Sequence, residues 1–207
     1  MRPAILGAIA GGSGGAALDP DVSAWLVRVA SAGGTVSAPT QSAVNTFVLA
    51  AKANGYWSTF QRLNLFCGDQ AASLVPLVNT AGSSTDANTG TTYAENTGPV
   101  TNGSSQYIST GLIPGAATGG ISLYLRTTQA SDTTVRIAIG CRDGGTTQVY
   151  RIVGNTGGDG AASSGAVSGS WGGQPGGVNI QAATTGGFVA AMWHIARTSS
   201  VLATLYK

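Results

Sequence analysis

Apolar residues recur at helical spacing in two stretches near the start of the chain. Each stretch places four of them at i, i+3, i+4 and i+7: Val22, Trp25, Leu26 and Val29, then Val44, Phe47, Val48 and Ala51. Asp19 supplies a capping side chain ahead of Pro20, and Gly33 is expected to end the first helix. Pro39 and Gly55 delimit the second in the same way. The pattern predicts two short helices and a helical turn near residues 56–60. Their apolar faces are expected to pack on each other or on a sheet.

Beyond these helices the pattern changes from helical spacing to alternation. Residues 63–67 form the first strand-like run, and residues 80–106 are expected to be loop with short extended pieces. The clearest strands are predicted at residues 121–126, 135–142, 149–153, 188–195 and 201–206. Asp143-Gly144 predicts a hairpin turn, and residues 154–187 a glycine-rich loop around Trp171. Short strands at this spacing predict a mainly β chain, folded as an antiparallel β-sandwich after the two helices.

These patterns divide the chain into a Gly-rich flexible arm (1–18), a helical anchor segment (19–67) and a β-sandwich domain (68–207). The arm is expected to order against a neighbour, and a secretion signal is the alternative for its short apolar run. Lys207 directly follows a predicted strand. We therefore expect the sandwich to be incomplete, or to be completed by strands from elsewhere. An arm and an uncovered strand both favour oligomerisation.

Charge is scarce along the whole chain, and this narrows the classes of partner. Charged residues make up 9% of the sequence, against roughly a quarter in ordinary globular proteins. The net charge is +2, and Lys and Arg form no cluster of the kind that binds nucleic acid. No run approaches the roughly 20 apolar residues of a membrane span. The sequence therefore predicts neither nucleic-acid binding nor membrane insertion.

Few residues are suited to metal binding or nucleophilic chemistry. Cys67 and Cys141 are either a disulfide or buried free thiols, and we favour the thiols. No Cys/His spacing resembles a zinc site, so no metal or cofactor is predicted. His194 lies between Trp193 and Ile195 on an alternating strand, where a structural role is the usual one. No serine has the surroundings of a nucleophile elbow.

Carboxyl groups do not suggest an enzyme either. Glycoside hydrolysis needs two carboxyls that face each other across a sugar. The β region offers six, mostly in predicted loops: Asp69, Asp86, Glu95, Asp132, Asp143 and Asp159. The glycine-rich run at 154–158 lacks the Lys-Ser/Thr of a phosphate-binding loop. We predict no catalytic residues and no enzymatic activity.

Three aromatic residues are candidates for carbohydrate binding. Trp171, Tyr93 and Tyr107 lie in or near predicted loops, beside Asn and Asp. Exposed aromatic rings stack on the apolar faces of sugars. The alternative is that these rings plug the ends of the sandwich, and fold alone does not establish a lectin.

The order of the segments adds a resemblance. It is carried by five pieces: Asp19-Pro20-Asp21 leading to Trp25, residues 39–45 leading to 52–57, residues 63–68, residues 101–107, and residues 194–200 leading to 205–207. In this order, over residues 19–207, they resemble tailed-bacteriophage virion proteins with a short helical segment and a concanavalin-like (laminin-G-like) β-sandwich. In such proteins the last strand continues into an Asn-Gly turn and further strands, which this chain lacks.

The resemblance implies a tail fibre, a tail-associated protein or a head decoration protein, located in the virion after assembly in the host cytoplasm. Its partners would be other virion proteins, copies of itself and host surface glycans. It implies no catalytic residues. A soluble or secreted carbohydrate-binding module is the alternative, and a polysaccharide depolymerase is a third and weaker one.

Overall fold

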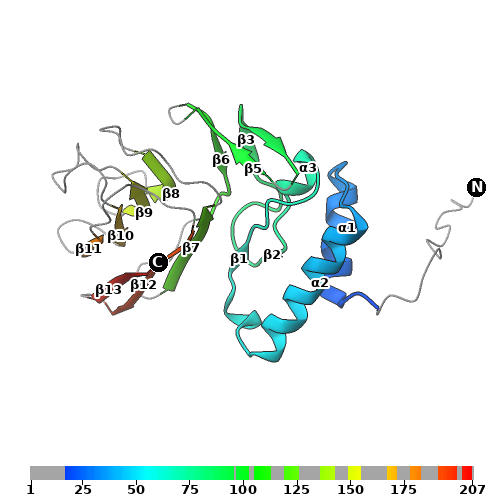
Figure 1. Cartoon of the computed structure of the whole chain (residues 1–207), viewed down its shortest axis with the longest axis horizontal. Helices are drawn as coiled ribbons and strands as arrows, with labels where there is room; N and C mark the ends of the chain where they lie inside the picture. The colour runs from blue at the N-terminus through cyan, green and yellow to red at the C-terminus, as the bar shows by residue number, and fades with distance from the viewer. Residues whose placement is uncertain are drawn as a thin grey trace, which may run out of the picture.

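Helices occupy one end of the molecule and the longer strands the other (Figure 1). The computed structural model describes residues 17–95, 97–102, 105–112, 119–125, 136–142, 149–154, 167–171, 178–182, 191–199 and 202–206. The predicted arm and the Asp143-Gly144 turn therefore lie almost entirely outside the described residues.

The first helix, α1, spans Pro20–Ser31 and begins as predicted. A carboxylate oxygen of Asp19 accepts a hydrogen bond from the backbone N–H of Asp21 at 2.9 Å. Pro20 takes the first helical position, where its missing N–H costs nothing. Gly33 follows the helix with φ +77°, a backbone conformation that glycine adopts without strain.

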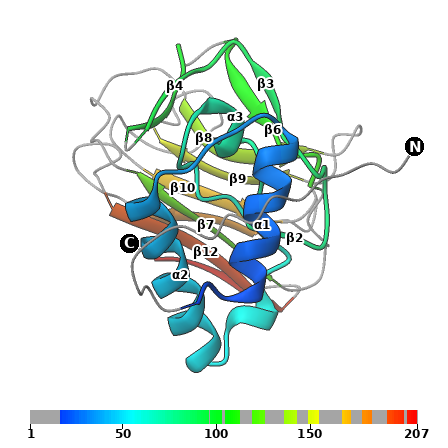
Figure 2. The ribbon, with the colours of Figure 1, turned by 90° about the vertical axis from the view of Figure 1, so that its right-hand side faces the viewer.

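The second helix, α2, spans Ala38–Ala53 and lies beside α1 (Figure 2). It has Pro39 in its first turn, and Gly55 follows its end with φ +75°. The predicted helical turn is the 3₁₀ helix η1, Trp57–Thr59. Both predicted helices are confirmed. The residues that begin and end a helix act over a few positions of local sequence, which is why the sequence could predict them.

The main described core joins these helices to the segment that follows them. Its buried apolar side chains are Val22, Trp25, Val29, Val44, Val48, Ala72, Val75 and Leu77. The last three lie in or after a short helix, α3 (Gln70–Ser73), which apolar spacing did not predict. This core therefore extends past residue 67, the boundary expected from the sequence.

Polar contacts attach the same segment to α1. The indole N–H of Trp25 donates to the carbonyl of Val75 at 3.0 Å. The Arg28 guanidinium donates to the carbonyls of Pro76 and Leu77 at 3.0 and 2.9 Å. Side chains of α1 thus donate hydrogen bonds to three backbone carbonyls that pair with no strand. Buried backbone groups need such partners.

Three short antiparallel pairs form between residues 62 and 109. They are β1 (Arg62–Leu63) with β2 (Val78–Asn79), β3 (Ala87–Thr89) with β6 (Tyr107–Ser109), and β4 (Thr92–Ala94) with β5 (Gly98–Val100). The strand predicted at 63–67 is largely wrong, since only Leu63 pairs and Phe66 has φ +49°. Leu65 and Cys67 face α2 and not a partner strand. Side-chain packing against α2, and not backbone hydrogen bonding to a strand, therefore holds this part of the chain.

The remaining strands form two antiparallel sheets. One sheet has the strand order β13 (Leu202–Tyr206), β12 (Ala191–Ser199) and β7 (Gly119–Leu125). The other has the order β11 (Val178–Ala182), β10 (Val167–Trp171), β9 (Val149–Gly154) and β8 (Arg136–Arg142). The strands β7, β8, β9, β12 and β13 agree with the predicted ones. Strands β11 and β13 contact each other across the two sheets. The described strands show no closed sandwich, so the sandwich stays a prediction.

The loop predicted for residues 154–187 is wrong where β10 and β11 lie. Trp171 ends β10 and is paired with Val178 of β11. Glycine has low strand propensity, so the glycine-rich local sequence of this stretch resembles that of a loop. Pairing to β9 on one side and β11 on the other places β10 inside a sheet.

Candidate functional site

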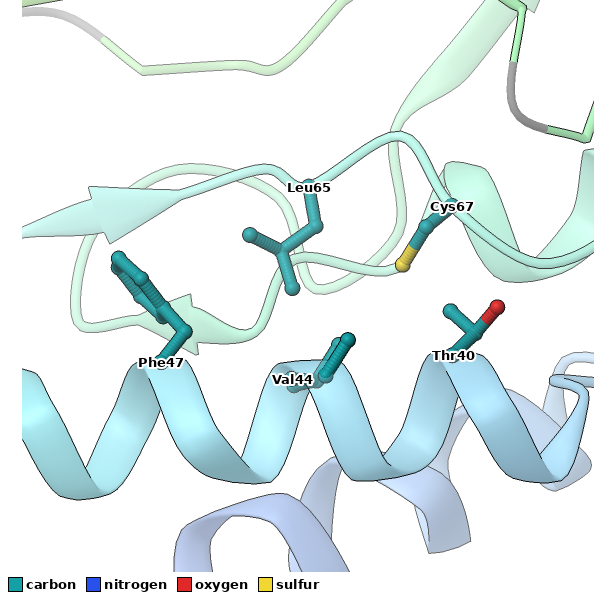
Figure 3. Close-up of a pocket in the computed structure, with 6 residues that line it drawn as sticks. Thr40, Val44, Phe47, Leu65 and Cys67 are labelled. Carbon is teal, nitrogen blue, oxygen red and sulfur yellow. The ribbon is translucent and has the colours of Figure 1, made fainter.

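The helical end carries an open apolar groove along α2 (Figure 3). It is open to solvent, has a volume of about 260 Å³ and is lined by Thr40, Ala43, Val44, Phe47, Leu65 and Cys67. The first four are one face of α2, at i, i+3, i+4 and i+7. Leu65 and Cys67, two residues apart in the chain, both point toward α2 from the opposite wall (Figure 3).

Cys67 in this groove is a free thiol and half-buried. Burial raises its pKa to about 11, and the nearby charge of Glu95 adds to the effect. The thiol is therefore protonated at neutral pH and is a poor nucleophile. The preference for a free thiol is confirmed for Cys67, while the side chain of Cys141 lies outside the described part.

A second exposed feature lies on β7 and β12. Tyr124 and Met192 are directly opposite each other in the register and are 63% and 52% exposed. The next pair on this face is Ser122 and His194, whose Oγ and Nδ1 atoms are 2.7 Å apart. Alternation of residues 121–125 predicts one polar face on β7, but no local pattern pairs Tyr124 with Met192.

The Ser122–His194 contact is within the reach expected of a nucleophile and its base. Burial lowers the pKa of His194, so its imidazole is neutral at pH 7. Ser122 lies in mid-strand, however, and not on the sharp strand-to-helix turn that presents a catalytic serine. The pair matches an ordinary cross-strand hydrogen bond that aligns β7 with β12.

Two carboxylates belong to the anchoring of the first helix. Lys52 of α2 bridges Asp19 and Asp21 at 2.6 and 2.7 Å. Its hydrogen bond to Asp19 is the main cause that lowers the pKa of that carboxyl. The same hydrogen bonds raise the pKa of Lys52. These charges therefore fix the start of α1 against α2.

Asp69 links α3 to the segment between α1 and α2. One carboxylate oxygen accepts from the Ala72 N–H at 2.8 Å, and the other accepts from the N–H and hydroxyl of Thr35 at 2.7 and 2.6 Å. Its own N–H donates to the Thr35 carbonyl at 3.0 Å. Burial works to raise the pKa of Asp69, but these hydrogen bonds together outweigh it and lower the pKa.

Asp86 and Arg62 form the centre of a buried polar network. The Arg62 guanidinium contacts Asp86 and also donates to Asn79, Ala81 and Ser83. The second Asp86 oxygen accepts from the side chain of Asn64. Burial raises the pKa of Asp86, opposed by the Arg62 charge and by hydrogen bonds from Asn64 and Arg62. The network holds the chain between β2 and β3 against β1.

The three residues predicted to bind carbohydrate lie in three different sheets. Tyr93 is on β4, where its hydroxyl donates to the Phe66 carbonyl at 2.8 Å, and burial raises its pKa to about 12. Tyr107 is on β6 and is 57% exposed. Trp171 ends β10. Tyr93 thus has an internal bonding role, whereas Tyr107 presents its ring to solvent.

Among the described residues, no three His, Cys, Asp or Glu side chains are grouped as a metal site would require. Within the same part of the chain, every helix is too short or too polar to cross a bilayer. No protein-family model, no curated protein and no solved structure matches this chain.

Proposed function

We propose that this chain is a structural protein of a tailed-bacteriophage particle and has no enzymatic activity. One observation carries the proposal: the described carboxylates are engaged in bonds that hold the fold together. Five of the eight acidic residues are described, and each has an internal partner: Asp19 and Asp21 with Lys52, Asp69 with Thr35, Asp86 with Arg62, and Glu95 with Ser37 and Thr40. Carboxylates used in this way support a structural role better than acid–base chemistry.

The ordered resemblance to phage virion proteins supports the particle setting. The helical end would anchor the protein to other virion proteins, or to copies of itself. The strand-rich end would face outward, as surface decoration or for attachment to the host. A sequence with only 9% charged residues and 32 glycines suits a part that packs among many identical neighbours.

The test is mass spectrometry of phage particles purified through a density gradient. The protein is expected at a constant ratio to the major capsid protein across the gradient fractions that contain intact particles. Absence from those fractions, with the protein present in the infected-cell lysate, would overturn the proposal.

A carbohydrate-binding module, soluble or secreted, is the second proposal, and the exposed ring of Tyr107 favours it. On a glycan array, Tyr107→Ala or Trp171→Ala would then abolish binding. Tyr56→Ala is the matched control, because Tyr56 is 39% exposed at the helical end. Equal loss for all three variants would contradict a site at either aromatic residue.

A polysaccharide depolymerase is the least supported function. It requires that the chain release reducing ends from host capsule or cell-wall polysaccharide. We expect no release above that of a heat-inactivated sample.

A further inference from the structure

The groove along α2 has the size and chemistry of a docking site for aliphatic side chains. Apart from the Thr40 hydroxyl and the Cys67 thiol, its lining is hydrocarbon. A cavity of about 150 Å³ lined by aliphatic and aromatic side chains is large enough to bind benzene. A groove of 260 Å³ therefore has room for one or two aliphatic side chains.

The N-terminal arm supplies side chains of this kind. Residues 3–10 read Pro-Ala-Ile-Leu-Gly-Ala-Ile-Ala and carry no charge. Ile5, Leu6 and Ile9 are its large apolar residues, and a Gly/Ser linker at 11–15 joins them to Ala17. Gly/Ser-rich sequences impose few conformational constraints, so this composition allows the apolar segment to reach the body of the protein.

The chain leaves this body next to α2. The N–H of Asp19 donates to the side chain of Asn45 at 2.7 Å, and Lys52 bonds the Asp19 carboxylate. Asn45 directly follows Val44, which lines the groove. The eight residues 11–18 join the apolar segment to Asp19 and would span up to about 26 Å if fully extended. The path from Asp19 around α2 to the groove is at most about half the circumference of a helix with its side chains, which is roughly 17 Å.

We propose that residues 3–10 dock into the α2 groove of their own chain, with an aliphatic side chain of the arm against Phe47 and Leu65. A short tether between a segment and its site gives an effective concentration in the millimolar range. This favours the chain's own arm over that of a second copy. The docked arm would cover hydrocarbon that α2 otherwise exposes to water.

Cys67 makes the proposal testable, because it lines the groove. In a Cys141→Ser background, Ile5→Cys, Leu6→Cys and Ile9→Cys each add one thiol to the full-length chain. Oxidation with copper phenanthroline is followed by non-reducing gel electrophoresis and peptide mass spectrometry. We expect at least one variant to form an intramolecular disulfide with Cys67 about tenfold faster than the linker control Ser13→Cys.

Three outcomes would overturn the proposal. Disulfide-linked dimers would assign the groove to a second copy. Equal rates for Ser13→Cys and the three arm variants would show random collision. No cross-link in any variant would show that the arm lies elsewhere.

A second measurement does not depend on a new disulfide. Alkylation of Cys67 by N-ethylmaleimide is compared in Leu6→Asp/Ile9→Asp and Ser13→Asp, again with Cys141→Ser. A charged arm is expected to leave the groove and raise the rate at least threefold, while Ser13→Asp leaves it unchanged. Equal rates in the two variants would contradict docking.

Discussion

Arg62 and Asp86 form an ion pair from which the fold excludes almost all solvent: 4% and 0% of their side chains are exposed. Arg62 lies on β1, and Asp86 lies just before β3, 24 residues later. The Asp86 N–H also donates to the Leu74 carbonyl at 2.8 Å. One residue thus connects β1, the segment after α3 and the chain leading to β3.

Removal of one partner from this pair should be costly. Asp86→Ala leaves the Arg62 guanidinium buried without its counter-charge, which lowers the free energy of unfolding by about 3–5 kcal/mol. Asp21→Ala is the control, since Asp21 pairs with Lys52 with 49% of its side chain exposed, and its loss costs about 0–1 kcal/mol. Urea unfolding followed by circular dichroism measures both. A loss for Asp86→Ala no larger than for Asp21→Ala would contradict a buried pair.

Two adjacent glycines should differ sharply in their tolerance of alanine. A Cβ on Gly34 would lie 2.5 Å from the backbone N of Ala72, so Gly34→Ala forces α3 away from the end of α1. Gly33→Ala meets nothing within 4 Å and carries only the strain of φ +77°, which costs about 1–2 kcal/mol. We expect Gly34→Ala to lower the thermal unfolding midpoint more than Gly33→Ala does. The reverse order would show that α3 does not approach α1 this closely.

The extent of the first folding unit is a third prediction. A fragment of residues 17–67 lacks Ala72, Val75 and Leu77 and should show no cooperative urea transition. A fragment of residues 17–112 retains them, the Arg62–Asp86 pair and β1 to β6, and should unfold in a single transition. Cooperative unfolding of the shorter fragment would place the boundary at residue 67 after all.

Acid should weaken the contacts of Asp69. Its folded pKa lies below the ordinary aspartate value of about 4, because its hydrogen bonds outweigh its burial. The unfolded chain therefore binds more protons in this range. The Asp69 contribution is fully present above that ordinary value and is lost as the pH falls through the folded pKa.

The measurement is the difference in unfolding free energy between wild type and Asp69→Asn from pH 7 to pH 2.5. The difference is expected to stay constant down to about pH 5 and then to shrink. A difference is needed because burial raises the pKa of Asp86, which acts with the opposite sign. A difference that grows in acid would contradict the lowered pKa of Asp69.

Local sequence accounts for α1, for α2 and for most of the longer strands. Capping by Asp19, a proline in the first turn and a glycine beyond the end act within a few residues, so α1 and α2 follow from the sequence alone. The alternation at 121–125 likewise predicted β7, with Ser122 and Tyr124 on its exposed face.

Tertiary structure decided what joins distant segments. Arg62 and Asp86 are far apart in sequence, and so are Asp69 and Thr35. No periodicity in the sequence therefore reveals that these residues pair. The Ser-Gly-Ser run at 168–170 became part of β10 because both neighbouring strands pair with it. Sequence by itself determined which segments become helix or strand wherever caps and periodicity suffice. Only the folded chain decided which polar groups share a buried site, because that depends on burial and pairing between remote residues.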